Sequence, residues 1–382
     1  MNEKANAKPL IGILTVAMLI LACSGTSPQQ STAPIEASPP ATSPPPVVSA
    51  PPTTPAPVVA QPGITPAQPT APAPATVPPT IAPGQSPSGK ALNPNPPTAP
   101  MRLIFVHHST GEGWLADDQG GLGLALRDSN YFVSDTNYGW GPDGIGDTTD
   151  IGHWFTWFRG PNSSAYLKAL YAEGEQNSEY SRLAQNPGGE NKIVLFKSCF
   201  PNSQLGGKPN APPTTGDNPL RGLESSSEHT TVANAKGIYN DLLQYFAARQ
   251  DKLFVVITAP PLTSQDSSPA NAANARALNN WLVKEWLSGY PHKNVFVFDF
   301  YNVLTSNGGG VGVNDLGQER GNHHRFWKGA AQHIQTASNN FSAYASAPDD
   351  SHPTGAGGKK ATGEFVPLLN MAVHCWLGEG GC

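Results

Sequence analysis

The sequence predicts an α/β fold, with three α/β/α layers in which helices cover both faces of a five-stranded parallel sheet. Five short segments rich in Val, Ile and Phe are spread along residues 101–382, and helix-like stretches lie between most of them. Strands that alternate with helices favour a parallel sheet buried on both sides. Sites in such folds form at the carboxyl ends of the strands.

Each expected strand is a short, mostly apolar run bounded by polar or turn residues. The expected strands are 102–106 (RLIFV), 131–136 (YFVSDT), 192–196 (KIVLF), 253–258 (LFVVIT) and 294–298 (NVFVF). Apolar side chains that recur at helical spacing predict the helices between and after them. The expected helices are 164–172, 231–248, 270–287, 324–344 and 355–374. Two long non-periodic stretches, 206–230 and 306–322, are expected to be lids, binding walls or disordered loops.

The region before the predicted domain has a very different composition. Residues 28–100 contain 24 of the 40 Pro, two charged residues and no Phe, Trp or Tyr. Such a segment cannot bury a core, so we expect a disordered, Pro-rich linker. We therefore divide the chain into a signal peptide at 1–22, a linker at 23–100 and one folded domain at 101–382.

The N-terminus predicts export. Lys4 and Lys8 precede an apolar run of 13 residues, 10–22, which is shorter than the ~20 residues of a membrane span and suits a signal peptide. The run ends in Ile20-Leu21-Ala22-Cys23, which resembles a bacterial lipobox and implies lipidation of Cys23; an ordinary signal peptide with an incidental cysteine is the alternative. We expect an extracytoplasmic domain held by a lipid on a bacterial cell membrane or cell surface.

Charge and cysteine content exclude several classes of protein. The net charge is −5 and charged residues make up 13% of the chain, so no broad basic surface for nucleic acid is expected. Four cysteines are too few for a disulfide scaffold. In an oxidising compartment we expect Cys375 and Cys382 to pair, which leaves Cys199 as the free thiol of the domain.

Polar residues with chemical potential follow several of the predicted strands. Ser109 follows the first strand in a His-His-Ser-Thr-Gly turn, and a Gly-rich block at 141–149 follows the second. Asn202 follows the third, where its side chain could donate to an oxyanion. Before the last helix, Asp349 and His352 are three residues apart, so the carboxylate could hold one imidazole nitrogen while the other faces a nucleophile. Each residue alone has an ordinary explanation as a turn or cap.

Taken in this order, the blocks resemble the SGNH (GDSL-type) hydrolase superfamily across residues 101–382, most specifically at Asp349-Asp350-Ser351-His352-Pro353. The resemblance implies a flavodoxin-like fold and a cofactor-free, metal-free serine hydrolase. It assigns Ser109 as nucleophile, His352 as base and Asp349 as orienting acid. The oxyanion hole would comprise the Ser109 N–H, the Asn202 side chain and a glycine N–H, best matched by Gly146, with Gly141 and Gly144 as alternatives.

Two blocks depart from the family pattern. His107-His108-Ser109 stands where Gly-Asp-Ser is usual, and Pro201 precedes Asn202 where the family has Gly-x-Asn-Asp. A metal site that uses histidines and a Cys199 nucleophile are therefore alternatives, although none of the histidines has a recognised ligand spacing. The candidate metal ligands are His107, His108, His153, His323, His324 and either Asp349 or Asp350.

The expected function is an ester hydrolase that removes short acyl groups, such as acetyl, from an extracellular polysaccharide. An aromatic group, Trp154, Phe155, Trp157 and Phe158, could form the wall of an acyl or sugar pocket or could equally be core. The alternatives are an O-acyltransferase that uses the same residues and a non-catalytic carbohydrate-binding or partner-binding module on the same fold.

Overall fold

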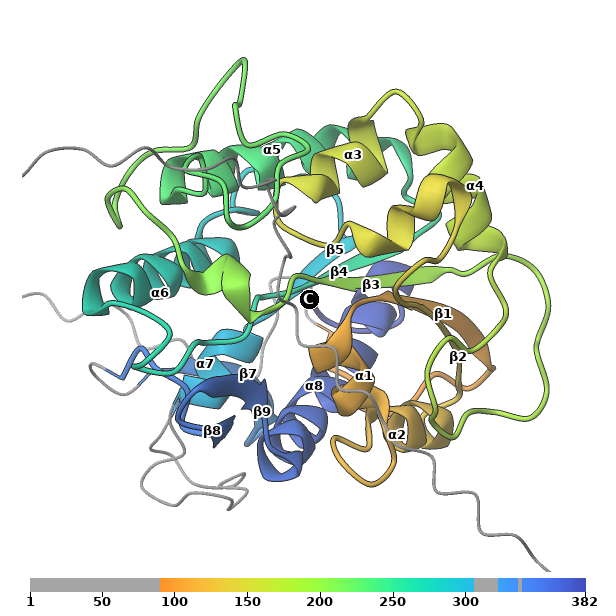
Figure 1. Cartoon of the computed structure of the whole chain (residues 1–382). Coiled ribbons are helices and arrows are strands. Elements are labelled where there is room, and N and C mark those ends of the chain that lie inside the picture. Colours follow the sequence, from red (N-terminus) through yellow and green to blue (C-terminus); the bar gives the residue numbers. More distant parts are fainter. Residues whose placement is uncertain (1–89, 306–321, 336–338) are drawn as a thin grey trace, which may run out of the picture. The chain divides into compact units, whose positions relative to one another are not determined.

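A five-stranded parallel sheet forms the centre of the domain (Figure 1). The computed structural model describes residues 90–305, 322–335 and 339–382. The strand order β2-β1-β3-β4-β5 is the flavodoxin-like order. The strands are β1 (Met101–Val106), β2 (Tyr131–Thr136), β3 (Ile193–Lys197), β4 (Leu253–Ile257) and β5 (Val295–Phe298). The predicted strands and the three-layer α/β/α class are confirmed.

Helices pack on both faces of the sheet (Figure 1). One layer contains α3 (His153–Arg159), α4 (Ser163–Ala172), α5 (Val232–Ala248) and α6 (Pro269–Lys284). The other contains α1 (Ser109–Leu115), α2 (Leu122–Asp128), α7 (Phe300–Thr305) and α8 (Gly355–Leu377). Within β1, Ile104 and Val106 join the first core and Leu103 and Phe105 the second. All four are fully buried, because alternate residues of a strand face opposite sides of the sheet.

The longer helices begin at side chains that the sequence supplies as caps. Thr231 accepts the Asn234 N–H at the start of α5, and Ser268 precedes Pro269 and accepts the Asn271 N–H at the start of α6. Thr354 accepts the Gly357 N–H at the start of α8. That cap places the N-terminus of α8 directly after His352.

The helix predicted at 324–344 is wrong. These residues contain an antiparallel hairpin of β6 (His323–Trp327) and β7 (Ala330–Ile334). Lys328 and Gly329 both have positive φ, 52° and 78°, the conformation of a two-residue hairpin turn. Farther along, β8 (Ala345–Ala347) and β9 (Asp350–Pro353) form a second antiparallel pair.

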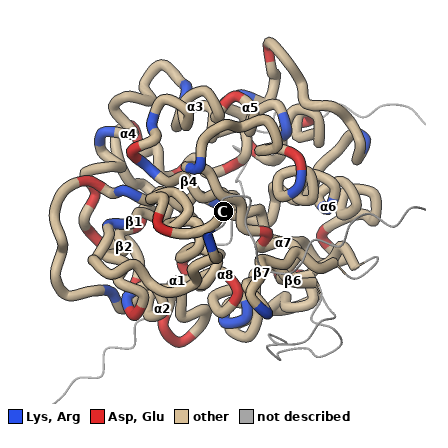
Figure 2. The backbone as a smooth tube through the Cα atoms, turned by 180° about the vertical axis from the view of Figure 1, so that it is seen from behind, with Lys and Arg blue, Asp and Glu red and all other residues tan. Residues whose placement is uncertain are grey.

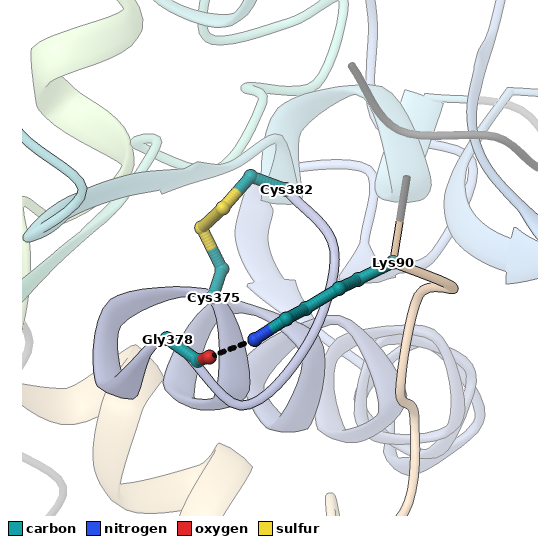
Figure 3. Close-up of a disulfide and its surroundings, with 4 residues drawn as sticks. All are labelled: Lys90, Cys375, Gly378 and Cys382. Atoms are coloured by element: carbon teal, nitrogen blue, oxygen red, sulfur yellow. Dashed lines mark hydrogen bonds between the residues drawn. A yellow bond between two sulfur atoms is a disulfide. The ribbon is translucent and has the colours of Figure 1, made fainter. Parts of the chain in front are cut away.

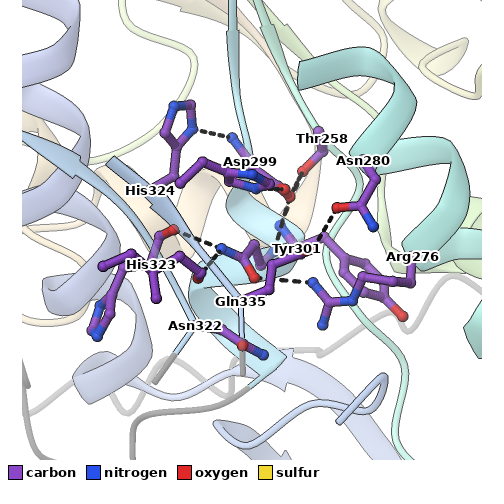
Figure 4. A network of polar contacts seen from close by, with 12 residues as sticks. Thr258, Arg276, Asn280, Asp299, Tyr301, Asn322, His323, His324 and Gln335 are labelled. Carbon is purple, nitrogen blue, oxygen red and sulfur yellow. Dashed lines mark hydrogen bonds and ion pairs between the residues drawn. The ribbon is translucent and has the colours of Figure 1, made fainter. Parts of the chain in front are cut away.

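A buried polar network ties the first hairpin to the ends of β4 and β5 (Figure 4). Asp299 is its centre: its Oδ2 lies 2.6 Å from His333 Nε2, and its backbone N–H donates to Nδ1 of His324. Burial alone would raise the pKa of Asp299, but the hydrogen bond and charge of His333 lower it overall. The network therefore holds an ionised carboxylate in the core and fixes the hairpin.

Residues 90–100, which the sequence places in the Pro-rich linker, pack against the end of α8. Lys90 Nζ donates to the Gly378 carbonyl across 2.6 Å (Figure 3), and Asn370 Nδ2 donates to the Pro94 carbonyl. Cys375 and Cys382 form the expected disulfide, which closes the C-terminal loop beside Lys90. The packed part of the chain thus begins before residue 101.

Charged residues are sparse along the described chain, and residues of both signs are interspersed (Figure 2). None of the helices in the described ranges is long and apolar enough to cross a membrane.

Loop 206–230 packs onto its neighbours: Arg221 pairs with Asp241 of α5 at 2.8 Å, and the Gly222 N–H donates to the Gly152 carbonyl. The expected signal peptide 1–22, the expected lipidation site Cys23, residues 24–89 of the expected linker and residues 306–321 lie outside the described residues.

Candidate active site

Ser109 and His352 meet at the carboxyl edge of the sheet. Ser109 is the first residue of α1, reached by a two-residue turn after β1, and His352 lies on β9 directly before α8. Ser109 Oγ lies 3.0 Å from His352 Nε2, although the two residues are 243 positions apart in sequence. The pairing predicted for nucleophile and base is therefore present.

The carboxylate that holds His352 is Asp350, not the predicted Asp349. Asp350 Oδ1 lies 2.6 Å from His352 Nδ1 and also accepts the His352 backbone N–H at 3.0 Å. The physical reason is strand periodicity: on β9, residues two apart share a face, whereas Asp349 lies in the exposed turn between β8 and β9. A spacing of three would suit a helical turn instead.

This chain of hydrogen bonds fixes the proton on His352. With Nδ1–H donated to Asp350, Nε2 is left to accept the Ser109 hydroxyl. Burial alone would raise the pKa of Asp350, but hydrogen bonds from the backbone and ring of His352 outweigh it and lower that pKa. Phe200 packs edge-on against the imidazole, with ring centroids 4.8 Å apart, and restricts its rotation.

The two histidines before Ser109 shape the turn. His107 is fully buried, and its Nε2 lies 3.1 Å from the Asp135 carboxylate of β2. His108 donates from Nε2 to the Gly146 carbonyl at 2.6 Å and stacks on the half-exposed Tyr138. Burial lowers the pKa of His108 to about 4 against the opposing effect of the Gly146 hydrogen bond, so this ring is neutral at pH 7. Both rings therefore position the serine.

The predicted oxyanion donors are engaged elsewhere. The Gly146 N–H donates to the Trp140 carbonyl at 2.8 Å, and that of the alternative Gly144 donates to Gly141. Asn202 is buried in the short 3-10 turn η2 (Phe200–Ser203), where its Nδ2 donates to Asp150 Oδ1 at 2.6 Å and to the Cys199 carbonyl at 3.3 Å. Pro201 at the start of this turn gives the loop a shape in which Asn202 ties two loops together. The assignments of Gly146 and Asn202 as donors are therefore wrong for this arrangement.

The aromatic group after the Gly-rich block is core. Trp154 and Trp157 are almost fully buried, and their indole N–H groups donate to Ser198 Oγ and the Thr148 carbonyl. Phe158 is likewise buried, and Phe155 packs at the edge of the same cluster. These side chains stabilise the layer of α3 to α6 and form no wall of the site.

A small pocket opens beside the Ser109–His352 pair. Its volume is about 50 Å³, and its lining comprises Ser109, Thr110, Gly113, Trp114, Gln119, Phe300, His352, Pro353, Thr354 and Gly358. Trp114 forms a rigid wall because its ring stacks on Phe300 at 4.6 Å and its N–H donates to Thr362. At ~10–15 Å³ for each water-sized group, the pocket has room for about four such groups.

The alternative chemistries are not assembled in the described ranges. No group of three metal-ligating side chains comes together there. His153, His323 and His324 lie apart in separate hydrogen bonds, with the Asp150 N–H, Glu364 and the Asp299 N–H respectively. Cys199 is buried beside Lys197, and the group within hydrogen-bond distance of His352 Nε2 is the Ser109 hydroxyl.

Comparisons with known proteins add little. No family model matches the chain, and no curated protein matches it. One solved structure is similar to 69% of this chain and 93% of its own, with 14% sequence identity and a TM-score of 0.29. A likeness of that size carries no argument about function.

Proposed function

We propose that this protein is a serine hydrolase that cleaves esters of short carboxylic acids, acetyl esters above all. The observation that carries the proposal is the continuous chain from Ser109 Oγ to His352 to Asp350, at 3.0 Å and 2.6 Å, beside a pocket lined by both Ser109 and His352. Nucleophile, base and orienting carboxylate in hydrogen-bond reach are the arrangement that activates a hydroxyl for acyl transfer.

In the proposed reaction, His352 Nε2 takes the Ser109 proton as Oγ attacks the ester carbon. The tetrahedral intermediate then collapses, and the imidazolium gives the proton to the departing alcohol. Water attacks the acyl-enzyme with His352 again as base, which releases the carboxylic acid and restores Ser109. Asp350 stabilises the imidazolium and keeps Nε2 directed at the serine.

The pocket favours a small acyl group. An acetyl group has three heavy atoms, which fits a space for about four water-sized groups, whereas a long acyl chain does not. We propose an acetylated extracellular polysaccharide as the substrate, reached by a domain exported through residues 1–22 and lipid-anchored at Cys23. Tyr138, half exposed on top of His108, offers an aromatic surface near the site for a sugar ring.

An active-site-directed fluorophosphonate tests the proposal. We expect the intact protein to be labelled once, with the mass shift on the peptide that contains Ser109, and to hydrolyse p-nitrophenyl acetate. Absence of both labelling and turnover would instead favour a non-catalytic binding module. Labelling on the peptide that contains Cys199 would favour the thiol alternative.

The acyl pocket gives a second prediction. Gln119 is exposed at the pocket mouth, so Gln119→Ala enlarges the space without disturbing the core. The ratio of kcat/KM for p-nitrophenyl butyrate to that for the acetate should rise about tenfold, since two methylenes at ~0.8 kcal/mol each gain contacts. Gln119→Glu, which keeps the size, should leave the ratio within about twofold. An unchanged ratio in Gln119→Ala would place the acyl group elsewhere.

A further inference from the structure

The Thr110 hydroxyl is a buried polar group that no other group of the described chain satisfies. Thr110 directly follows Ser109 in α1 and is 3% exposed. Its Oγ1 has no hydrogen-bond partner within the part of the chain that the structure describes. Because a buried hydroxyl that loses water without a replacement is costly, such a group usually has its partner in a ligand or an ordered water.

The location of this hydroxyl indicates the kind of partner. Thr110 lines the pocket together with Ser109 and His352, so the residue that carries this hydroxyl adjoins the space where the reacting ester would lie. Two other polar side chains in this wall already have partners: the Trp114 N–H donates to Thr362, and Thr354 Oγ1 accepts the Gly357 N–H. Of the side chains of Trp114, Thr354 and Thr110, the Thr110 hydroxyl is the one that can still donate to an oxygen atom in the pocket.

The reaction needs such a donor. The tetrahedral intermediate carries a full negative charge on the former carbonyl oxygen, and fixed donors at that position provide much of the rate enhancement in acyl transfer. The Gly146 N–H donates to the Trp140 carbonyl instead. Asn202 Nδ2 donates to Asp150 Oδ1 and to the Cys199 carbonyl. Of the expected donors, the Ser109 N–H and the alternative Gly141 N–H remain, and a further donor beside them would replace the two that are engaged.

We propose that the Thr110 hydroxyl is that donor and hence a catalytic residue, an inference that rests on the proposed hydrolase function. As Ser109 Oγ bonds to the ester carbon, the C=O π pair moves to oxygen, and the Thr110 O–H donates to the resulting oxyanion. The serine proton goes to His352 Nε2. When the oxyanion pair re-forms the carbonyl and the alcohol leaves, the Thr110 hydroxyl keeps its proton.

Thr110→Val and Thr110→Ser test this role, because the first keeps the shape and removes the hydroxyl and the second keeps the hydroxyl. For p-nitrophenyl acetate we expect kcat to fall about 10²-fold to 10³-fold in Thr110→Val, with KM little changed, and to remain within about tenfold of wild type in Thr110→Ser. The rate of fluorophosphonate labelling should fall in parallel, since the phosphonyl oxygen occupies the same position.

Thermal unfolding separates catalysis from folding. Thr110→Val removes an unpaired buried hydroxyl, so its melting temperature should equal or exceed that of wild type. Thr136→Val is a matched control: Thr136 Oγ1, at the end of β2, is also buried and has no partner among residues 90–305, 322–335 and 339–382, but Thr136 does not line the pocket. It should show the same thermal behaviour with unchanged kcat.

Equal kcat in Thr110→Val and Thr110→Ser would overturn the assignment, as would a loss of kcat that accompanies a lowered melting temperature in both. These outcomes leave the proposed function intact when wild type is labelled at Ser109 and turns over esters. An unlabelled, inactive wild type would refute the hydrolase itself.

Discussion

Ser109→Ala and His352→Ala are each expected to lower kcat for p-nitrophenyl acetate by about 10⁴-fold to 10⁶-fold. The two side chains act as a unit, because the hydroxyl at 3.0 Å from Nε2 is a weak nucleophile until the imidazole removes its proton. The double variant should therefore be no slower than either single variant. Steady-state kinetics on the three proteins, with melting temperatures to verify folding, measure this.

Cys199→Ala is the control for that experiment. The thiol is buried next to the third strand, and both ring nitrogens of His352 already pair with Ser109 and Asp350, so its removal should leave kcat within a few-fold of wild type. A Ser109→Ala protein that retains more than a few per cent of wild-type kcat, or a Cys199→Ala protein that is inactive, would contradict the assignment of the nucleophile.

Asp350→Asn is expected to lower kcat about 10²-fold to 10³-fold. An amide at this position no longer stabilises the imidazolium and can present N–H to Nδ1, which favours the wrong tautomer. The loss should be smaller than the ~10⁴-fold of a buried triad carboxylate, since the Asp350 side chain is 45% exposed and solvent screens part of its charge. The measurement is kcat over a range of pH.

Asp349→Asn is the matched control, because it makes the same chemical change one residue away in an exposed turn. Its kcat should stay within about twofold of wild type.

Since the pKa of Asp350 lies below its usual value, its carboxylate stays ionised as the pH falls past the unfolded pKa, and its contribution to stability is lost only when the pH passes through the lower, folded pKa. Asp350→Asn should therefore have a lower melting temperature than wild type at pH 7, and the two melting temperatures should converge in strong acid. If Asp349→Asn lowered kcat more than Asp350→Asn, the carboxylate that orients His352 would be Asp349.

Much of the fold follows from local sequence. The five apolar runs predict the strands because parallel strands buried on both faces are apolar throughout. The missed hairpin of β6 and β7 shows the limit: its 324–344 region has no long apolar run, and the decisive signal was the turn at Lys328-Gly329, where two consecutive residues adopt positive φ. The hairpin is held by side chains from β5 and α8, and local patterns do not record such contacts.

The site was predictable where it depended on order along the chain and not where it depended on local backbone geometry. Ser109 and His352 follow from their places beside strand ends. The choice of Asp350 over Asp349 depends on whether His352 lies on a strand or a helical turn, and the engagement of Asn202 depends on Asp150, 52 residues away. Thr110 could have been suspected from its place beside the serine, but only its burial without a partner gives it a role.

The contact between Lys90 and the end of α8 fixes where the described, folded part of the chain begins. Helix α8 starts beside His352 and, over its 23 residues at 1.5 Å each, extends about 35 Å away from the edge of the sheet that carries Ser109 before it reaches Gly378. Anything that precedes Lys90 is thus joined to the opposite end of the domain.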